Sequence, residues 1–340
     1  MRNAADHPDQ FRPRTIVRLA LGLGVASTLV FGGIARAEDT VLTTAIPGVT
    51  APGIPIVFLK RNMTSSEGPV AAPDGGIYFT EPTVNKIYKV APDDTITTVF
   101  DAYKIDDPKG ERWRMPSLAM DAKGVIYACR RAGGKIGVAI VLPEDKARFV
   151  ADNYKGVPFG APNDLSVARD GGIYFTDPGD PGQGAARPHN IYYIKPTGEV
   201  VDATDQLQSP NGLVLSRDEK TLYAVDSKSE YVYAFEVAAD HTLKNRRHFA
   251  HLKGFETTAK GFNNGIDGMA IDNDGRVYVI TLAGLEVFTP KGEALGIIPV
   301  PVKAQNLAFG GKDGHTLYVV GHGNLYKIPT LSQKFTGRAK

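Results

Sequence analysis

The sequence predicts an all-β fold, a six-bladed β-propeller with four-stranded blades. A pair formed by an apolar residue and a tyrosine recurs six times, each time after a tight polar turn. Successive tyrosines of these pairs lie 49, 47, 49, 55 and 40 residues apart, and they are Tyr78, Tyr127, Tyr174, Tyr223, Tyr278 and Tyr318. A repeat of roughly 40 to 50 residues built from strand-forming segments is typical of a propeller, in which each repeat forms one blade.

The fourth repeat shows the expected strands most clearly. The apolar run 212–216 predicts a strand buried on both faces, and 221–226 predicts a second strand after a polar turn. The alternating run 231–236 predicts a third strand, and 247–252 a fourth, exposed one. One repeat therefore supplies the four strands of one blade.

The last repeat provides only three strands, at 307–309, 316–320 and 325–328. A propeller has to close, because an open sheet edge promotes aggregation. We therefore expect a strand within 54–60 to complete this blade and close the ring. The polar residues after Thr330 are expected to be unstructured.

The chain is expected to form one folded domain, the propeller, at residues 54–330. The repeats fill this range and leave no room for a second domain. Residues 38–53 are then an N-terminal extension and residues 331–340 a C-terminal tail.

The first 37 residues are expected to be a signal peptide. A basic stretch precedes the apolar run 19–34, which is short for a membrane span and is followed by the small-x-small pattern Ala35-Arg36-Ala37. An uncleaved N-terminal anchor is the alternative. With cleavage after Ala37, we expect a periplasmic or secreted protein without membrane contact.

The composition is that of an ordinary globular protein. Hydrophobic residues make up 42% and charged residues 22%, and the formal net charge of +2 gives no basic field that would favour nucleic acid. The single cysteine, Cys129, cannot form an internal disulfide, and we expect it in the core. The expected partner is a small-molecule substrate, and the expected state is a monomer or small homo-oligomer.

The tyrosine repeat also aligns four side chains that carry oxygen atoms. Each lies 11 or 12 residues before its tyrosine, just ahead of the innermost predicted strand, and they are Glu67, Asn163, Asn211 and Asp267. The two other repeats have Pro116 and, with one inserted residue, Gln305 at this position. Because innermost strands line the central channel, the four side chains are expected to meet at its mouth.

Such a ring suits a divalent cation, and the chemistry of its donors favours Ca²⁺. Calcium accepts six to eight oxygen ligands in loose geometry, whereas zinc is usually bound by histidine or cysteine, which this ring lacks. The alternative is that these residues only cap the turns before the strands, as Asn and Asp often do.

The segments around these residues resemble the senescence marker protein/gluconolactonase/luciferin-regenerating enzyme family of six-bladed propellers. The matching segments are Glu67-Gly-Pro69, Pro162-Asn-Asp164, Pro210-Asn-Gly-Leu213, Ile266-Asp-Gly-Met269 and Asn306-Leu-Ala-Phe-Gly-Gly311. The resemblance implies that Glu67, Asn211 and Asp267 hold the metal, and that Asn163 contacts metal or substrate. The related diisopropyl fluorophosphatase uses a similar set.

The leading hypothesis is metal-assisted hydrolysis of a lactone or similar cyclic ester, with Asp267 and Asn163 as catalytic residues. The resemblance implies that Asp267 orients or deprotonates the attacking water. One alternative is a phosphotriesterase at the same site, where Asp267 is a nucleophile on phosphorus. Another is a non-catalytic propeller that binds calcium or a ligand.

Further candidates for contacts with the substrate are Asp164, Arg130, Gln305 and His322. Sugar lactonases of the family commonly have an arginine two residues before the asparagine that matches Asn163, and this chain has Ala161 there. The Gly- and Pro-rich segment 177–189 is either a lid over the site or an ordinary surface loop. The sequence therefore locates a site better than it names a substrate.

Overall fold

The computed structural model describes residues 40–102, 115–179, 189–259 and 261–337. The described chain is all-β, and two short 3-10 turns, η1 (Pro82–Val84) and η2 (Glu144–Lys146), are its only helical elements. Among these residues, no helix is long and apolar enough to cross a membrane. The predicted signal peptide lies outside the described residues.

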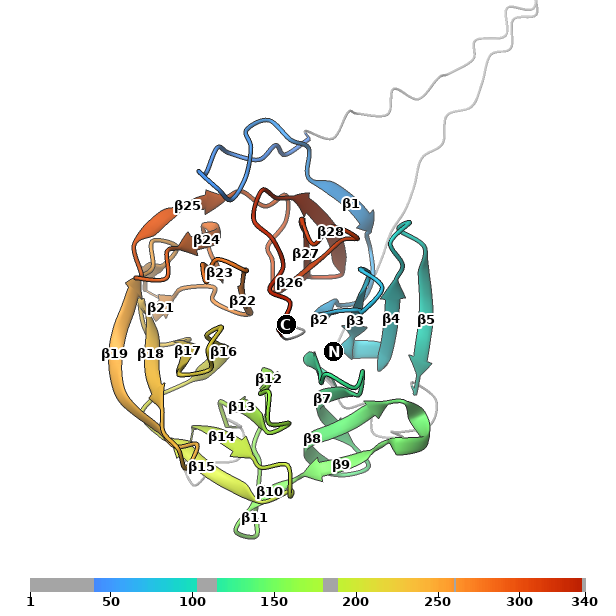
Figure 1. The fold of residues 1–340 in the computed structure, drawn as a ribbon, viewed down its shortest axis with the longest axis vertical. Helices are drawn as coiled ribbons and strands as arrows, with labels where there is room; N and C mark the ends of the chain where they lie inside the picture. The colour runs from blue at the N-terminus through green and yellow to red at the C-terminus, as the bar shows by residue number, and fades with distance from the viewer. Residues whose placement is uncertain (1–39, 103–114, 180–188, 260, 338–340) are drawn as a thin grey trace, which may run out of the picture. The chain divides into compact units, whose positions relative to one another are not determined.

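Six four-stranded antiparallel sheets form the blades of a propeller (Figure 1), which confirms the predicted fold. Blade 1 consists of β2 (Glu67–Ala71), β3 (Ile77–Glu81), β4 (Lys86–Val90) and β5 (Ile96–Asp101). Blade 2 consists of β6 (Ser117–Met120), β7 (Ile126–Ala132), β8 (Lys135–Leu142) and β9 (Arg148–Ala151). Blade 3 consists of β12 (Leu165–Val167), β13 (Ile173–Asp177), β14 (Asn190–Ile194) and β15 (Val200–Thr204). Blade 4 consists of β16 (Pro210–Leu215), β17 (Thr221–Asp226), β18 (Tyr231–Val237) and β19 (Leu243–His251).

Blades 5 and 6 complete the ring. Blade 5 consists of β22 (Met269–Ile271), β23 (Val277–Thr281), β24 (Gly284–Phe288) and β25 (Ala294–Ile298). Blade 6 consists of β26 (Asn306–Gly310), β27 (Thr316–Gly321), β28 (Asn324–Pro329) and β1 (Val57–Lys60). Two small hairpins stand apart, β10 (Asn153–Tyr154) with β11 (Val157–Pro158) and β20 (Glu256–Thr258) with β21 (Gly261–Asn263). The innermost strands of the six blades are β2, β6, β12, β16, β22 and β26. Those of neighbouring blades contact one another around the axis.

The ring closes through β1, as the sequence predicts. This strand pairs antiparallel with β28, and Phe58 lies opposite Tyr326. The last blade therefore combines the two ends of the propeller in one sheet, with β1 as its outermost strand.

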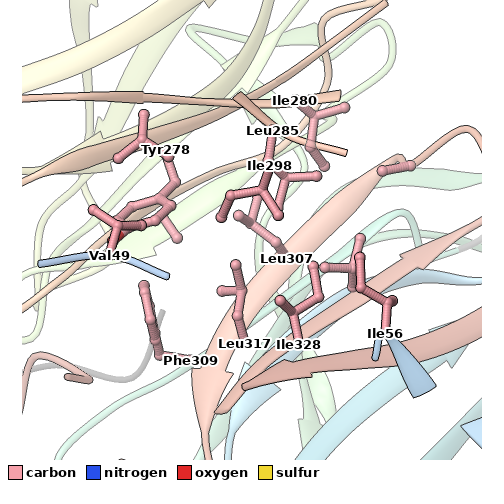
Figure 2. Close-up of a cluster of buried hydrophobic side chains, with 14 of the residues drawn as sticks. Val49, Ile56, Tyr278, Ile280, Leu285, Ile298, Leu307, Phe309, Leu317 and Ile328 are labelled. Atoms are coloured by element: carbon pink, nitrogen blue, oxygen red, sulfur yellow. The ribbon is translucent and has the colours of Figure 1, made fainter. Parts of the chain in front are cut away.

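The core lies between the blades, as Figure 2 shows for blades 5 and 6. Tyr278 belongs to the tyrosine repeat and is fully buried there, with its hydroxyl 3.0 Å from Asp272 Oδ2 and 2.9 Å from Ser332 Oγ. Val49, from the N-terminal extension, is buried in the same cluster. Cys129 is fully buried in the cluster shared by blades 2 and 3, which confirms the prediction of a core residue.

The C-terminal tail is ordered over residues 331–337, so the prediction of an unstructured tail is wrong there. Lys334 forms a β-bridge with Asp272 of blade 5, and the Phe335 ring is buried beneath the guanidinium of Arg217 of blade 4. Tail residues also line a hollow with Pro73 and other residues of the turns that follow the inner strands. The tail packs because one aromatic ring and specific backbone bonds outweigh its polar composition.

Replacing Phe335 by alanine is expected to lower the free energy of unfolding by about 3 kcal/mol, because it removes a buried aromatic side chain. Denaturant unfolding measures this loss. Leu331→Ala is the matched control, because Leu331 lies in the same tail and is 56% exposed. Equal unfolding free energies for the two variants would contradict the docked tail.

Candidate functional site

The four aligned oxygen-bearing residues stand where the inner strands begin. Glu67 is the first residue of β2 and Asn211 the second of β16, whereas Asn163 and Asp267 each precede their inner strand by two residues. The strand pairing shifts register between Glu67 and Val70. Bulges of this kind re-aim side chains and are common beside active sites.

All six aligned positions line one cavity of about 410 Å³. They are Glu67, Pro116, Asn163, Asn211, Asp267 and Gln305, one from each blade. Arg130, Arg131, Ile136, Ala161, Pro162 and Pro178 complete the wall. The structure thus brings the four predicted metal ligands together with Arg130 and Gln305.

Glycines after three of these residues allow neighbouring blades to approach closely. A Cβ atom added to Gly212 would lie 2.2 Å from the Asp267 carbonyl oxygen of the next blade. One added to Gly268 would lie 2.1 Å from Asn306 Oδ1, and one on Gly68, which also has φ of +51°, would lie 2.6 Å from Ser117 Cα. These contacts give a physical reason for glycine in the Glu-Gly, Asn-Gly and Asp-Gly pairs.

Glu67 is a buried carboxylate, only 4% exposed, in a field of other negative charges. Burial raises its pKa well above the ordinary value, the charge of Asp267 raises it next, and that of Asp164 adds to both. Hydrogen bonds oppose this rise, among them one of 3.1 Å donated by the Gly68 N–H to Oε2. These effects make the charged form of Glu67 unfavourable on its own, and a cation at the cavity would stabilise that form.

Asn211 provides an independent sign that a ligand atom belongs here. Its Oδ1 is buried and has no hydrogen-bond partner among the described residues. An unsatisfied buried acceptor is costly, and binding to a cation would satisfy it. His, Cys, Asp and Glu alone form no three-ligand cluster in the described chain, so a site here depends on its asparagine donors.

Gln305 links Glu67 to the last blade. Its Nε2 donates to Glu67 Oε1 at 3.0 Å, and its Oε1 accepts the His322 backbone N–H at 2.7 Å. Gln305 therefore fixes the orientation of the Glu67 carboxylate, in addition to lining the cavity.

The structure places Asp164 behind the cavity wall, although the sequence predicts that it contacts the substrate. It is 1% exposed and does not belong to the cavity wall. Its Oδ1 accepts the Leu165 N–H at 3.0 Å and its Oδ2 the Leu213 N–H of the next blade at 3.2 Å. Its carboxylate joins two inner strands just behind the site.

Arg130 and His322 lie on two sides of the site. Arg130 is half-buried in the cavity wall, with its guanidinium 5.4 Å from the centre of the Phe100 ring. His322 is more exposed and lines an adjoining cavity. Partial burial lowers the pKa of its imidazole, and the charge of Lys303 lowers it further.

Three carboxylates that hold the loops of the site were missed by sequence reasoning. Asp226 accepts the N–H groups of Gln208 and Ser209 just before the Asn211 strand, at 2.7 and 3.1 Å. Asp177 does the same for the loop before Asn163, and Glu81 for the loop before Glu67. All three stand three residues after a repeat tyrosine, so the same repeat contains the signal that would have found them.

Part of the Gly- and Pro-rich segment 177–189 lies outside the described residues. Of the segment proposed as a lid, residues 180–188 are not described. Its first residue, Asp177, is buried and belongs to β13.

The fold and the cavity define a six-bladed propeller with oxygen-bearing side chains gathered where its inner strands begin. The chain belongs to the SMP-30/Gluconolactonase/LRE-like family, whose region matches residues 65–322. It is 29% identical over 297 residues to a gluconolactonase from Zymomonas mobilis, covering 81% of each chain.

Solved structures agree with this membership. A gluconolactonase from Xanthomonas campestris is similar with a TM-score of 0.69 and 27% identity, covering 87% of this chain and 99% of its own. The calcium-binding protein regucalcin from Agrobacterium tumefaciens has the same fold, with a TM-score of 0.63, 17% identity and coverage of 82% and 94%.

Proposed function

We propose that this protein is a hydrolase that opens lactones or related cyclic esters with the help of a bound divalent cation. The observation that carries the proposal is the cavity that four blades line with Glu67, Asn163, Asn211 and Asp267. Membership of the gluconolactonase-like family and the similarity to two gluconolactonases support the lactonase activity.

The donor set fits calcium. Two carboxylates and two amides offer only hard oxygen ligands, and the unsatisfied Asn211 Oδ1 together with the crowded charge around Glu67 favours a cation. When bound, the cation would polarise the ester carbonyl and stabilise the negative charge that develops on its oxygen.

The residues of the chain supply the rest of the reaction. Water attacks the ester carbonyl carbon, the ring C–O bond breaks, and the ring oxygen takes up a proton to give the open hydroxy acid. In this proposal Asp267 orients the water and receives its proton, while Asn163 holds the ester in place. Arg130, on the same wall, offers its guanidinium to substrate oxygens.

The test is an assay of the purified protein on a neutral aldonolactone and on a phosphotriester. We expect acid release from the lactone at constant pH, its loss after treatment with a chelator, and recovery with added calcium. Turnover of the phosphotriester alone would replace lactonase by phosphotriesterase. Calcium binding without turnover of either substrate would leave a binding propeller and overturn the proposal.

A further inference from the structure

A second cavity, of about 340 Å³, adjoins the one that holds the aligned residues. Asp267 and Gln305 belong to the walls of both cavities, so the two hollows share a boundary at the proposed reaction site. Its remaining lining comes from turns within blades 4 and 6 and from the connections before blades 5 and 6, and is Ser227, Lys228, Phe262, Asn263, Asn264, Gly265, Ile266, Lys303 and His322. We call this hollow the side cavity.

The side cavity carries an excess of positive charge. Lys228 and Lys303 are exposed in its wall, and Asp267 is the only acidic residue among the described residues that line it. Some lysines of the described chain are ion-paired, such as Lys89 with Asp74, and others are not. Neither Lys228 nor Lys303 has an ion-pair partner among the salt bridges of the described residues.

The side-chain amides of two asparagines in the wall are occupied by other bonds. Asn264 Nδ2 donates to the Asp226 and Ser229 carbonyl oxygens, and Asn263 Nδ2 donates to Glu256 Oε1. The donors that stay available to a ligand therefore include the two ammonium groups. Two cations in a concave wall attract an anion, and their field is strengthened where water is excluded.

The shared boundary connects this charge to the chemistry. Because Asp267 and Gln305 belong to both walls, a substituent of a molecule whose ester lies beside Asp267 is adjacent to the side cavity. The substituent would then meet Lys228 and Lys303, while the ester stays in the cavity lined by the six aligned positions. A neutral substituent would leave both lysines unpaired, whereas an anionic one would pair with them.

We propose that the side cavity is a subsite for an anionic substituent, so that the substrate is a lactone carrying a carboxylate or a phosphate group. This inference rests on the proposed lactone hydrolysis and names its substrate class. Lys303 and Lys228 act here as specificity-determining residues that bind the anion and take no part in breaking the ester bond.

The test compares three lactones of one ring size: a neutral aldonolactone, its phosphate ester and a relative carrying a carboxylate. We expect kcat/KM to be highest for one of the anionic lactones. In Lys303→Met, the ratio of anionic to neutral kcat/KM should fall by roughly tenfold, mainly through KM, as expected for loss of one charge-assisted bond. The phosphate and carboxylate arms identify which anion the subsite prefers.

Lys291→Met is the matched control, because it removes the same charge from an exposed turn between β24 and β25. It should leave the ratio unchanged. A parallel fall for neutral and anionic lactones in Lys303→Met would overturn the subsite, and so would a wild-type preference for the neutral lactone. In either case, turnover of the neutral lactone would leave the proposed hydrolase intact.

A binding measurement decides the matter even if no lactone is turned over. Calorimetric titration with a phosphorylated aldonate, which is the hydroxy acid of the anionic lactone, should show binding to the chelator-treated protein. Lys303→Met should weaken that binding roughly tenfold, and Lys291→Met should not. Equal binding of a neutral sugar and of the phosphorylated aldonate would overturn the proposal.

Discussion

The Asp267→Asn variant is expected to lose at least about a hundredfold in kcat/KM for lactone hydrolysis, which is the range for loss of a positioned acid–base group. The amide has nearly the shape of the carboxylate, so the fold should be kept. It cannot accept the proton of the attacking water, and it offers a cation one negative charge fewer. The charge of Asp267 also raises the pKa of Glu67, so its removal should lower that pKa.

Kinetic assays and calcium titration together measure this effect, with Asp274→Asn as the control. This variant makes the same chemical change in the same blade. Asp274 lies in an exposed turn at the end of the inner strand that is opposite to Asp267. The control should have wild-type kinetics. If Asp267→Asn keeps most of its activity, Asp267 does not orient the water, and the proposed mechanism is wrong.

The second large effect is expected for Gly212→Ala. Its Cβ atom would meet the Asp267 carbonyl oxygen at 2.2 Å, so the start of blade 4 or blade 5 must move. Forcing an extra carbon into such a contact is expected to cost about 2 kcal/mol of unfolding free energy. Because the movement displaces Asn211 or Asp267, we also expect kcat/KM to fall, by roughly a hundredfold for a displacement near 1 Å.

Gly76→Ala separates the two effects. A Cβ atom there would lie 2.1 Å from the Val90 carbonyl oxygen, an equally severe contact, but within the outer part of blade 1. We expect similar losses of stability for both variants by denaturant unfolding, and loss of calcium affinity for Gly212→Ala alone. Equal calcium affinities would show that the glycine contact does not position the site.

The fold was predictable because the same local pattern recurs in every blade. The second strand of blade 4 has the predicted bounds, Thr221–Asp226, since its apolar residues and its polar turn agree on one structure. The tail was not predictable in this way. Ser332 and Lys334 are polar, and what orders them is a set of bonds to residues far away in sequence, such as that from the Tyr278 hydroxyl to Ser332.

The candidate site could also be located because its residues recur from blade to blade. Its surroundings were missed because they do not recur. A repeat aligns residues that hold equivalent places, so Glu67 and Asn211 could be matched across blades. Lys228 and Lys303 lie in connecting loops that differ from blade to blade, and no spacing relates them. Their proximity depends on how neighbouring blades pack, which a single sequence does not state.

The closure of the ring by β1 has a consequence for the order of events during synthesis. Phe58 leaves the ribosome before any blade is made but pairs with Tyr326, which belongs to the sixth blade. The cavity needs Glu67 from the first blade and Gln305 from the sixth, so it is assembled only when all six blades have been made. A chain that stops before blade 6 therefore lacks a finished site, and binding at that site reports that all six blades are present.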